Sequence, residues 1–208
     1  MPAPRPRRPA ARRLKVPRPR RGTPVETRDR LVAAAAEELN RVGFHGTDTN
    51  RIARAAGYAP GTFYKHFPDK RAVLLAAYEA WVTTEWQAIG RLLAEGGTAA
   101  ARAERIVEAV LDFHRTWRGL RASLRALVAI DPDVRAFYWA QRRRQLDSLR
   151  AIRKTAASAA ARAADAQLLY GLERVCDAIA EGEARALGVD EAALVEGLVA
   201  MVRAALAR

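Results

Sequence analysis

The chain has 208 residues, 50% of them hydrophobic, and a formal net charge of +13. This is enough apolar material for a packed core, and no run of about 18 apolar residues that could span a bilayer occurs. A single cysteine, Cys176, excludes an internal disulfide framework, and the three histidines lack zinc-ligand spacing. We therefore expect a soluble cytoplasmic protein without metal or cofactor, in which Cys176 is a small buried hydrophobe.

The positive charge is concentrated in residues 1–22, which carry nine basic side chains, no acidic one and six of the ten prolines. Such a segment cannot bury apolar surface, so we expect a disordered basic arm. It lacks the continuous apolar stretch of a secretory signal. Two interpretations stay open: the arm lies along the minor groove of DNA, or it only keeps the protein in solution.

Beyond residue 22 the sequence predicts an all-α fold, because it is rich in Ala, Leu, Arg and Glu and shows no strand-like alternation. Thr27 can cap a first helix whose apolar positions follow helical spacing. Gly43 supplies the left-handed position that ends this helix.

Two short helices are expected next. Asp48 can cap a helix over residues 49–56, which ends at Gly57. A two-turn helix over residues 60–67 follows, with Pro60 at its first position, an apolar side and a proline directly after it. Two helices separated by a three-residue turn match the plan of a helix-turn-helix.

Longer helices make up the rest of the chain. Asp69 can cap a helix that continues to about Leu93, before the break at Gly96-Gly97. Apolar stripes and capping residues then predict helices through residues 106–117, 120–127, 134–160, 165–187 and 190–207.

A run of characteristic residues covers 43–70: Gly43-Phe44, Thr47, the segment 52–58 and Gly-Thr-Phe-Tyr-x-His-Phe-x-x-Lys at 61–70. This run resembles the N-terminal domain of TetR-family repressors. The similarity covers about residues 27–81, roughly a quarter of the chain. It implies a helix-turn-helix DNA-binding domain followed by a helical domain that binds a ligand and dimerises.

The start of the second short helix suits DNA recognition, because small groups let backbone amides and side chains reach the duplex. The resemblance implies phosphate contacts for Tyr64, His66 and Lys70. Base contacts are then expected from neighbouring donors such as Lys65 and Asn50. The candidate DNA-binding residues are Thr49, Asn50, Ala59, Pro60, Gly61, Thr62, Tyr64, Lys65, His66 and Lys70.

Ala59-Pro60 departs from the family pattern, since many relatives carry a serine and then a polar residue here. The change removes a hydroxyl cap and one backbone donor, so we expect fewer direct contacts to DNA. An alternative stays open, in which Phe63, Tyr64 and Phe67 are only the core of an ordinary helical hairpin.

The second half of the chain offers two candidate sites. Aromatic and polar side chains of the middle helices form a candidate effector pocket, made of Phe113, His114, Trp117, Phe137, Tyr138, Gln141 and Tyr170. The last helices carry more apolar positions than one core requires, and the candidate dimer interface is Leu168, Leu172, Val175, Val195, Val199 and Val202. In both cases an ordinary intrachain core is the alternative.

We divide the chain into a basic arm (1–22), a helix-turn-helix domain (23–70), a connecting helix (71–95) and a ligand-binding and dimerisation domain (96–208). The predicted function is that of a homodimeric regulator that binds a pseudo-palindromic operator in double-stranded DNA and is released by an unidentified small-molecule effector. Activation instead of repression would leave the same motif.

The sequence leaves two alternative functions to consider. One is a ligand-independent or nonspecific DNA-binding protein that uses the basic arm. The other is an enzyme, but no Gly-rich phosphate loop, Gly-x-Ser-x-Gly or His-Glu-x-x-His motif occurs, and we expect no catalytic residues.

Overall fold

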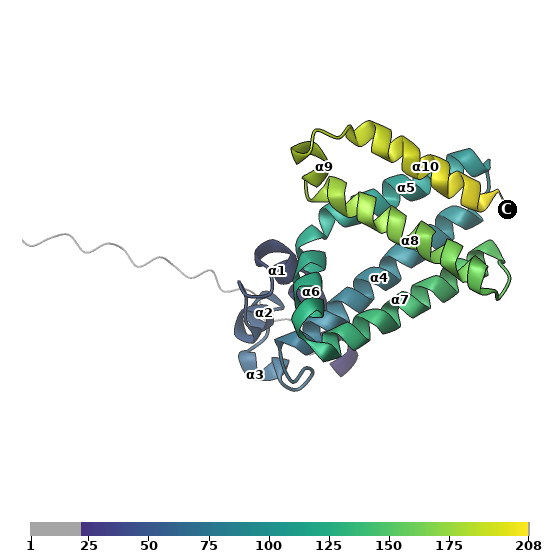
Figure 1. The fold of residues 1–208 in the computed structure, drawn as a ribbon. Coiled ribbons are helices and arrows are strands. Elements are labelled where there is room, and N and C mark those ends of the chain that lie inside the picture. The colour runs from purple at the N-terminus through teal and green to yellow at the C-terminus, as the bar shows by residue number, and fades with distance from the viewer. Residues whose placement is uncertain (1–21, 208) are drawn as a thin grey trace, which may run out of the picture.

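The structure is a computed structural model that describes residues 22–207, so the predicted basic arm lies outside the described residues except for Gly22. Within this range the chain folds into helices only, which confirms the all-α prediction (Figure 1). None of these helices is both long and apolar enough to cross a membrane. In order they are α1 (Pro24–Val42), α2 (Thr49–Ala55), α3 (Pro60–Phe63), α4 (Lys70–Ala94), α5 (Ala99–Thr116), α6 (Arg118–Ile130), α7 (Pro132–Arg153), α8 (Ala159–Ala180), α9 (Glu183–Ala186) and α10 (Glu191–Leu206).

The first helix begins earlier than predicted, because its cap is Thr23 and not Thr27. The Thr23 hydroxyl accepts a hydrogen bond from the Glu26 amide, and the Glu26 carboxylate accepts one from the Thr23 amide. This reciprocal pair is a capping box, with Pro24 at the first helical position. Thr27 is buried inside the first turn, and Gly43 ends the helix with φ 73°, as expected.

The boundary between α7 and α8 also differs from the prediction. The helix expected over 134–160 ends at Arg153, because Lys154 adopts a left-handed conformation (φ 51°). The Ser158 hydroxyl accepts a hydrogen bond from the Ala161 amide and so starts α8 before residue 165. The helix stops at Ala180, where Gly182 (φ 78°) leads into the short α9.

The buried apolar side chains form two clusters. The first cluster contains side chains from α1, α2, α3, α4 and α6 and from the start of α7. The helix-turn-helix part therefore shares its core with residues such as Leu120, Leu124 and Val134. The second lies between α5, α8 and α10 and includes the buried Cys176. Figure 1 shows α4 running from the end that holds α1, α2 and α3 into the end formed by α5, α8 and α10. The domain limits given above remain a prediction.

Candidate DNA interface and effector cavity

The two short helices form where the sequence places them. The Asp48 carboxylate accepts a hydrogen bond from the Arg51 amide at 2.8 Å and so caps α2. Gly57 adopts φ 82° and turns the chain toward α3. Ile52, Ala53 and Phe63 are fully buried between the helices. Their burial fixes α2 against α3 and turns the opposite side of α3 outward.

The helix α3 is a single turn, not the two turns predicted. After Phe63 the chain continues in tight turns, with the His66 amide donating to the Phe63 carbonyl at 2.9 Å. Ala59 provides no side-chain cap, as its residue type implies. Phe67 is still buried, so the segment from α3 to Phe67 is anchored at both ends.

The predicted DNA-binding residues lie at or near the surface of this segment. Asn50, Ala59, Gly61, Tyr64 and Lys65 are exposed, and Thr49, Pro60, Thr62, His66 and Lys70 are half-buried. The hydroxyl groups of Tyr64 and Thr49 are 2.9 Å apart, which links α2 to the residues after α3. A Cβ at Gly61 would meet no atom within 4 Å, so open space lies in front of this position.

Lys70 has an internal role that the sequence did not reveal. Its ammonium group donates to the carbonyl oxygens of Phe44 and Thr47 and lies 4.2 Å from the centre of the Phe44 ring. Partial burial lowers the pKa of Lys70, and nearby Asp48 opposes this shift. Lys70 therefore ties the start of α4 to the loop after α1, which leaves one of its three N–H groups for a phosphate.

Sequence reasoning missed Arg28, which lies on α1 and is exposed. Its guanidinium group lies over the Phe67 ring, 5.0 Å from the ring centre. The contact places a cation beside the end of the segment from α3 to Phe67. The sequence shows that Arg28 lies on the polar face of the first helix, shortly before Leu31. It does not show that this face meets Phe67.

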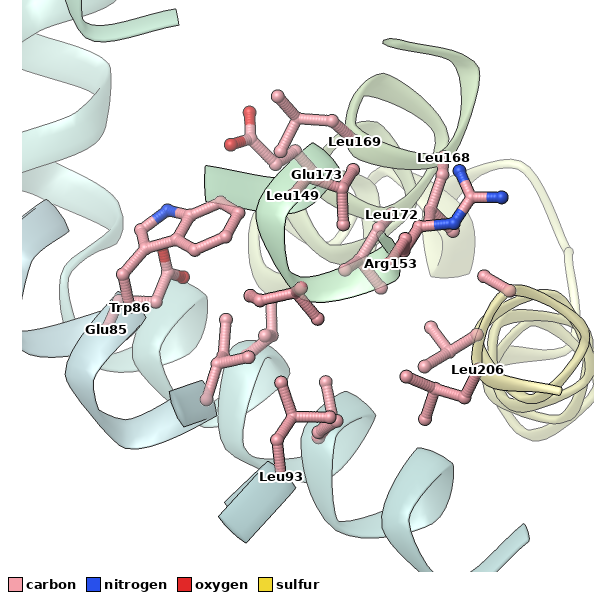
Figure 2. A pocket seen from close by; sticks show the side chains of 16 residues that line it. Glu85, Trp86, Leu93, Leu149, Arg153, Leu168, Leu169, Leu172, Glu173 and Leu206 are labelled. Atoms are coloured by element: carbon pink, nitrogen blue, oxygen red, sulfur yellow. The ribbon is translucent and has the colours of Figure 1, made fainter. Parts of the chain in front are cut away.

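A cavity of about 70 Å³ lies between α4, α5, α7, α8 and α10. Its walls are mostly aliphatic, and the acid Glu85 and the aromatic Trp86 lie next to each other on the α4 side (Figure 2). Ligand pockets for drug-sized molecules hold about 300–1,000 Å³. A ligand of that size would therefore have to move the surrounding helices apart.

The predicted pocket residues do not line this cavity and do not surround a common space. Phe113 and Trp117 pack toward α1 and α4, and Phe137 lies edge-on to Tyr78 with ring centres 6.4 Å apart. The remaining residues are engaged elsewhere: Gln141 donates to Glu79, Tyr138 and Tyr170 both lie beneath the Arg142 guanidinium, and His114 is buried beside Trp81.

A network of charged side chains lies next to the cavity. The Asp177 carboxylate accepts hydrogen bonds from His114 Nδ1 at 2.8 Å and from Arg121 and Arg125. Burial would raise the pKa of Asp177, but the hydrogen bonds from His114 and Arg121 outweigh it and hold the pKa far below its usual range. Burial lowers the pKa of His114 despite this partner. The network thus joins α5 and α6 to α8 through a permanently charged carboxylate.

The predicted interface residues are used largely inside the chain. Val202 is buried, Leu168 and Leu172 line the cavity, and the half-buried Val175, Val195 and Val199 pack against the second cluster. The exposed positions of α10 include small residues, namely Ala193, Gly197, Ala200 and Ala204, together with the charged Glu196 and Arg203.

Comparison with known proteins identifies the N-terminal part. Residues 31–77 match the family described as bacterial regulatory proteins, tetR family. Among curated proteins, the class C tetracycline repressor protein of Escherichia coli is 41% identical over 56 residues, which are 27% of this chain and 26% of that protein. The chain spans about a quarter of the length of the curated relatives it matches.

Solved structures resemble a larger share of the chain. A TetR-family transcriptional regulator from Streptomyces coelicolor has a TM-score of 0.63 at 20% identity and covers 88% of this chain and 95% of its own. The regulator FadR from Bacillus subtilis, solved in complex with stearoyl-CoA, has a TM-score of 0.59 at 18% identity. The match covers 85% of this chain and 98% of FadR. At these identities the likeness concerns the fold. Residues 31–77 therefore form a DNA-binding domain of the tetR family of bacterial regulatory proteins, and the described chain as a whole shares the fold of such regulators.

Proposed function

We propose that this protein is a sequence-specific DNA-binding transcriptional regulator, most simply a repressor that a small-molecule effector releases from its operator. The observation that carries the proposal is the segment from Ala59 to Lys65. Its buried side chain, Phe63, holds it against α2, while Gly61, Tyr64 and Lys65 face outward. A short helix presented in this way can enter the major groove, with polar neighbours on the phosphates.

The roles within this segment follow from chemistry. Tyr64 and His66 carry donors suited to phosphate oxygens, and Lys65 can donate to guanine N7 or O6. Asn50, exposed on α2, can pair with adenine. Lys70 acts mainly as a positioning residue, because two of its donors are bound to backbone carbonyls.

The effector would enter the cavity between α4, α5, α7, α8 and α10. Support comes from α4, which lines the cavity with Glu85 and Trp86 and begins at Lys70, beside the DNA-binding segment. Widening the cavity would displace α4. This movement would change the distance between the two DNA-binding segments of a dimer. FadR of Bacillus subtilis, which has the same fold, binds stearoyl-CoA.

The proposed dimer uses the outer faces of α8 and α10. The small exposed residues of α10 allow close approach of a second copy, and Met201 and Tyr170 lie nearby on the two helices. A two-fold dimer would place two recognition segments on successive half-sites of a palindromic operator.

The test is selection of bound sequences from random double-stranded DNA, followed by titration of the enriched sequence and a scrambled one. We expect enrichment of a palindrome that binds at least about a thousandfold more tightly than bulk DNA. A Lys65→Ala variant should bind it more weakly, whereas Lys154→Ala, on the loop before α8, should not. Equal affinity for all sequences would favour the nonspecific alternative instead.

A further inference from the structure

Glu85 is the unusual residue of the cavity. It belongs to α4, its side chain is 5% exposed, and its Oε1 atom makes no hydrogen bond within the described part of the chain. Nε2 of His114 on α5 lies 3.7 Å from this oxygen, and that nitrogen has no hydrogen-bond partner among the described residues either. A carboxyl group in this state has an unused acceptor next to an apolar space.

The other charged groups at the cavity are already paired. Glu173 of α8 forms an ion pair with Arg142 of α7, and Arg153 of α7 forms one with Asp165 of α8. His114 donates its Nδ1 proton to Asp177, and burial keeps its ring neutral near pH 7. The two arginines near Glu85 form ion pairs with other carboxylates, Arg121 with Asp177 and Arg142 with Glu173, and neither forms one with Glu85.

The charged and titratable groups near Glu85 come from four helices: His114 from α5, Arg121 from α6, Arg142 from α7, and Glu173 and Asp177 from α8. Burial and the neighbouring Glu173 raise the pKa of Glu85 to about 8, against the opposing effect of the two arginines. With this pKa the Glu85 carboxyl group holds a proton at pH 7. A ligand cation can take the place of this proton.

We propose that the effector cavity selects a lipophilic cation with an N–H donor, such as an alkylammonium ion, whose charged end binds Glu85. The inference rests on the proposed function, because it names the chemical class of its effector. The ammonium donates to the unpartnered carboxylate oxygen and lies beside the Trp86 ring, while the alkyl chain fills the aliphatic remainder.

Other ligand classes fit the cavity less well. An anion placed next to Trp86 would lie near Glu173 and would keep Glu85 in its protonated form, so neither acid would attract it. A neutral alkyl chain would fill the apolar part but form no hydrogen bond with Glu85, so it would forgo that contribution to affinity. A lipophilic cation matches the apolar walls and also offers a charged donor to the buried acid.

The experiment is calorimetric titration of the full chain with three probes of equal chain length: decylammonium, decanol and decanoate, each below its micelle-forming concentration. We expect decylammonium to bind at least about tenfold more tightly than decanol, and decanoate to bind most weakly. Glu85→Gln should remove the preference for the cation and keep the affinity for decanol. The matched control is Glu108→Gln, which makes the same change on the exposed face of α5 and should retain the preference.

Equal affinity for decylammonium and decanol, no binding of decylammonium, or a cation preference that survives Glu85→Gln would each overturn the proposal. The comparison of probes on the unchanged protein is decisive even if the variant folds poorly, which circular dichroism reports. The titration contains no DNA. Failure of the proposed function would appear separately, as the absence of any enriched operator sequence.

Discussion

The backbone of Gly119 in α6 lies directly against the carbonyl group of Asn40 in α1. The Gly119 amide donates to Asn40 Oδ1 at 2.9 Å, and the Asn40 side chain in turn donates to the Thr116 carbonyl at 2.8 Å. A Cβ atom on Gly119 would lie 1.9 Å from the Asn40 carbonyl oxygen. The first helix of the DNA-binding part is thus fixed to the corner between α5, which lines the cavity, and α6.

Gly119→Ala should push α1 away from α6. Because the obstacle is backbone and cannot rotate aside, we expect a loss of about 1–3 kcal/mol of unfolding free energy, measured by urea denaturation. The control is Gly90→Ala in α4, where a Cβ would meet nothing within 4 Å. That change should raise stability by about 0.5–1 kcal/mol. Equal stabilisation by both changes would show that α1 and α6 are not in contact.

Lys70→Met should lower stability, because the carbonyl oxygens of Phe44 and Thr47 lose their donor while the side-chain stem is kept. We expect a loss of about 1–2 kcal/mol in urea denaturation. Lys65→Met is the matched control, because Lys65 is exposed and donates no side-chain hydrogen bond to a described residue. The unfolding free energy of this variant should stay within about 0.5 kcal/mol of that of the unchanged protein. If Lys70→Met were equally neutral, the positioning role of Lys70 would be wrong.

Tyr64→Phe should weaken DNA binding uniformly. The hydroxyl group lies at the surface, shared with Thr49, and a phosphate contact through it carries no sequence information. We expect roughly a fivefold to tenfold loss of affinity for operator and scrambled DNA alike, measured by fluorescence anisotropy. A change in the ratio of the two affinities would contradict this role, because it would make Tyr64 a base-reading residue.

The parts of the fold set by neighbouring residues could be predicted from the sequence. Asp48, Asp69 and Gly43 start or end their helices as expected, since capping depends on residues only a few positions away. The helix α3 was predicted too long because Pro68 marks the last possible end of the helix. Its actual end after Phe63 depends on how the segment packs against α2.

The proposed effector cavity could not be predicted, because it depends on which sides of five helices face one another. Phe113 of α5 and Phe137 of α7 are aromatic side chains of the middle helices. Both turn toward the core shared with the DNA-binding part. The sequence did contain one signal for Glu85. It follows Tyr78 and Trp81 at helical spacing, which places an acid on the buried side of α4.

Ala200→Arg should dissociate the proposed dimer. Ala200 lies on the exposed face of α10, where a second copy would approach closely, and a long charged side chain cannot be buried there without a partner. We expect sedimentation analysis to show monomers at concentrations where the unchanged protein is dimeric, with loss of operator affinity. Ala126→Arg, at an exposed position of α6, should leave the dimer intact. An Ala200→Arg dimer would move the interface away from α10.

The burial of Glu85 should make stability depend on pH. Its pKa is about 8 in the folded chain against an ordinary value of 4.5. Between these values the folded state holds a proton that the unfolded state has released. The stabilisation from this group is therefore complete below about pH 4.5 and is lost as pH rises toward 8, with a slope of at most about 1.4 kcal/mol per pH unit.

Glu85→Gln removes this titration. His114, whose pKa is lowered, has the opposite effect in both proteins, because it makes the folded state less stable as pH falls below about 6.5. The difference between the two proteins therefore isolates Glu85. Urea denaturation at pH 5, 6, 7 and 8 should show the variant gaining stability relative to the unchanged protein as pH rises. Parallel curves would mean that water or a positive charge reaches the Glu85 carboxylate, in which case a ligand cation would gain little by binding it.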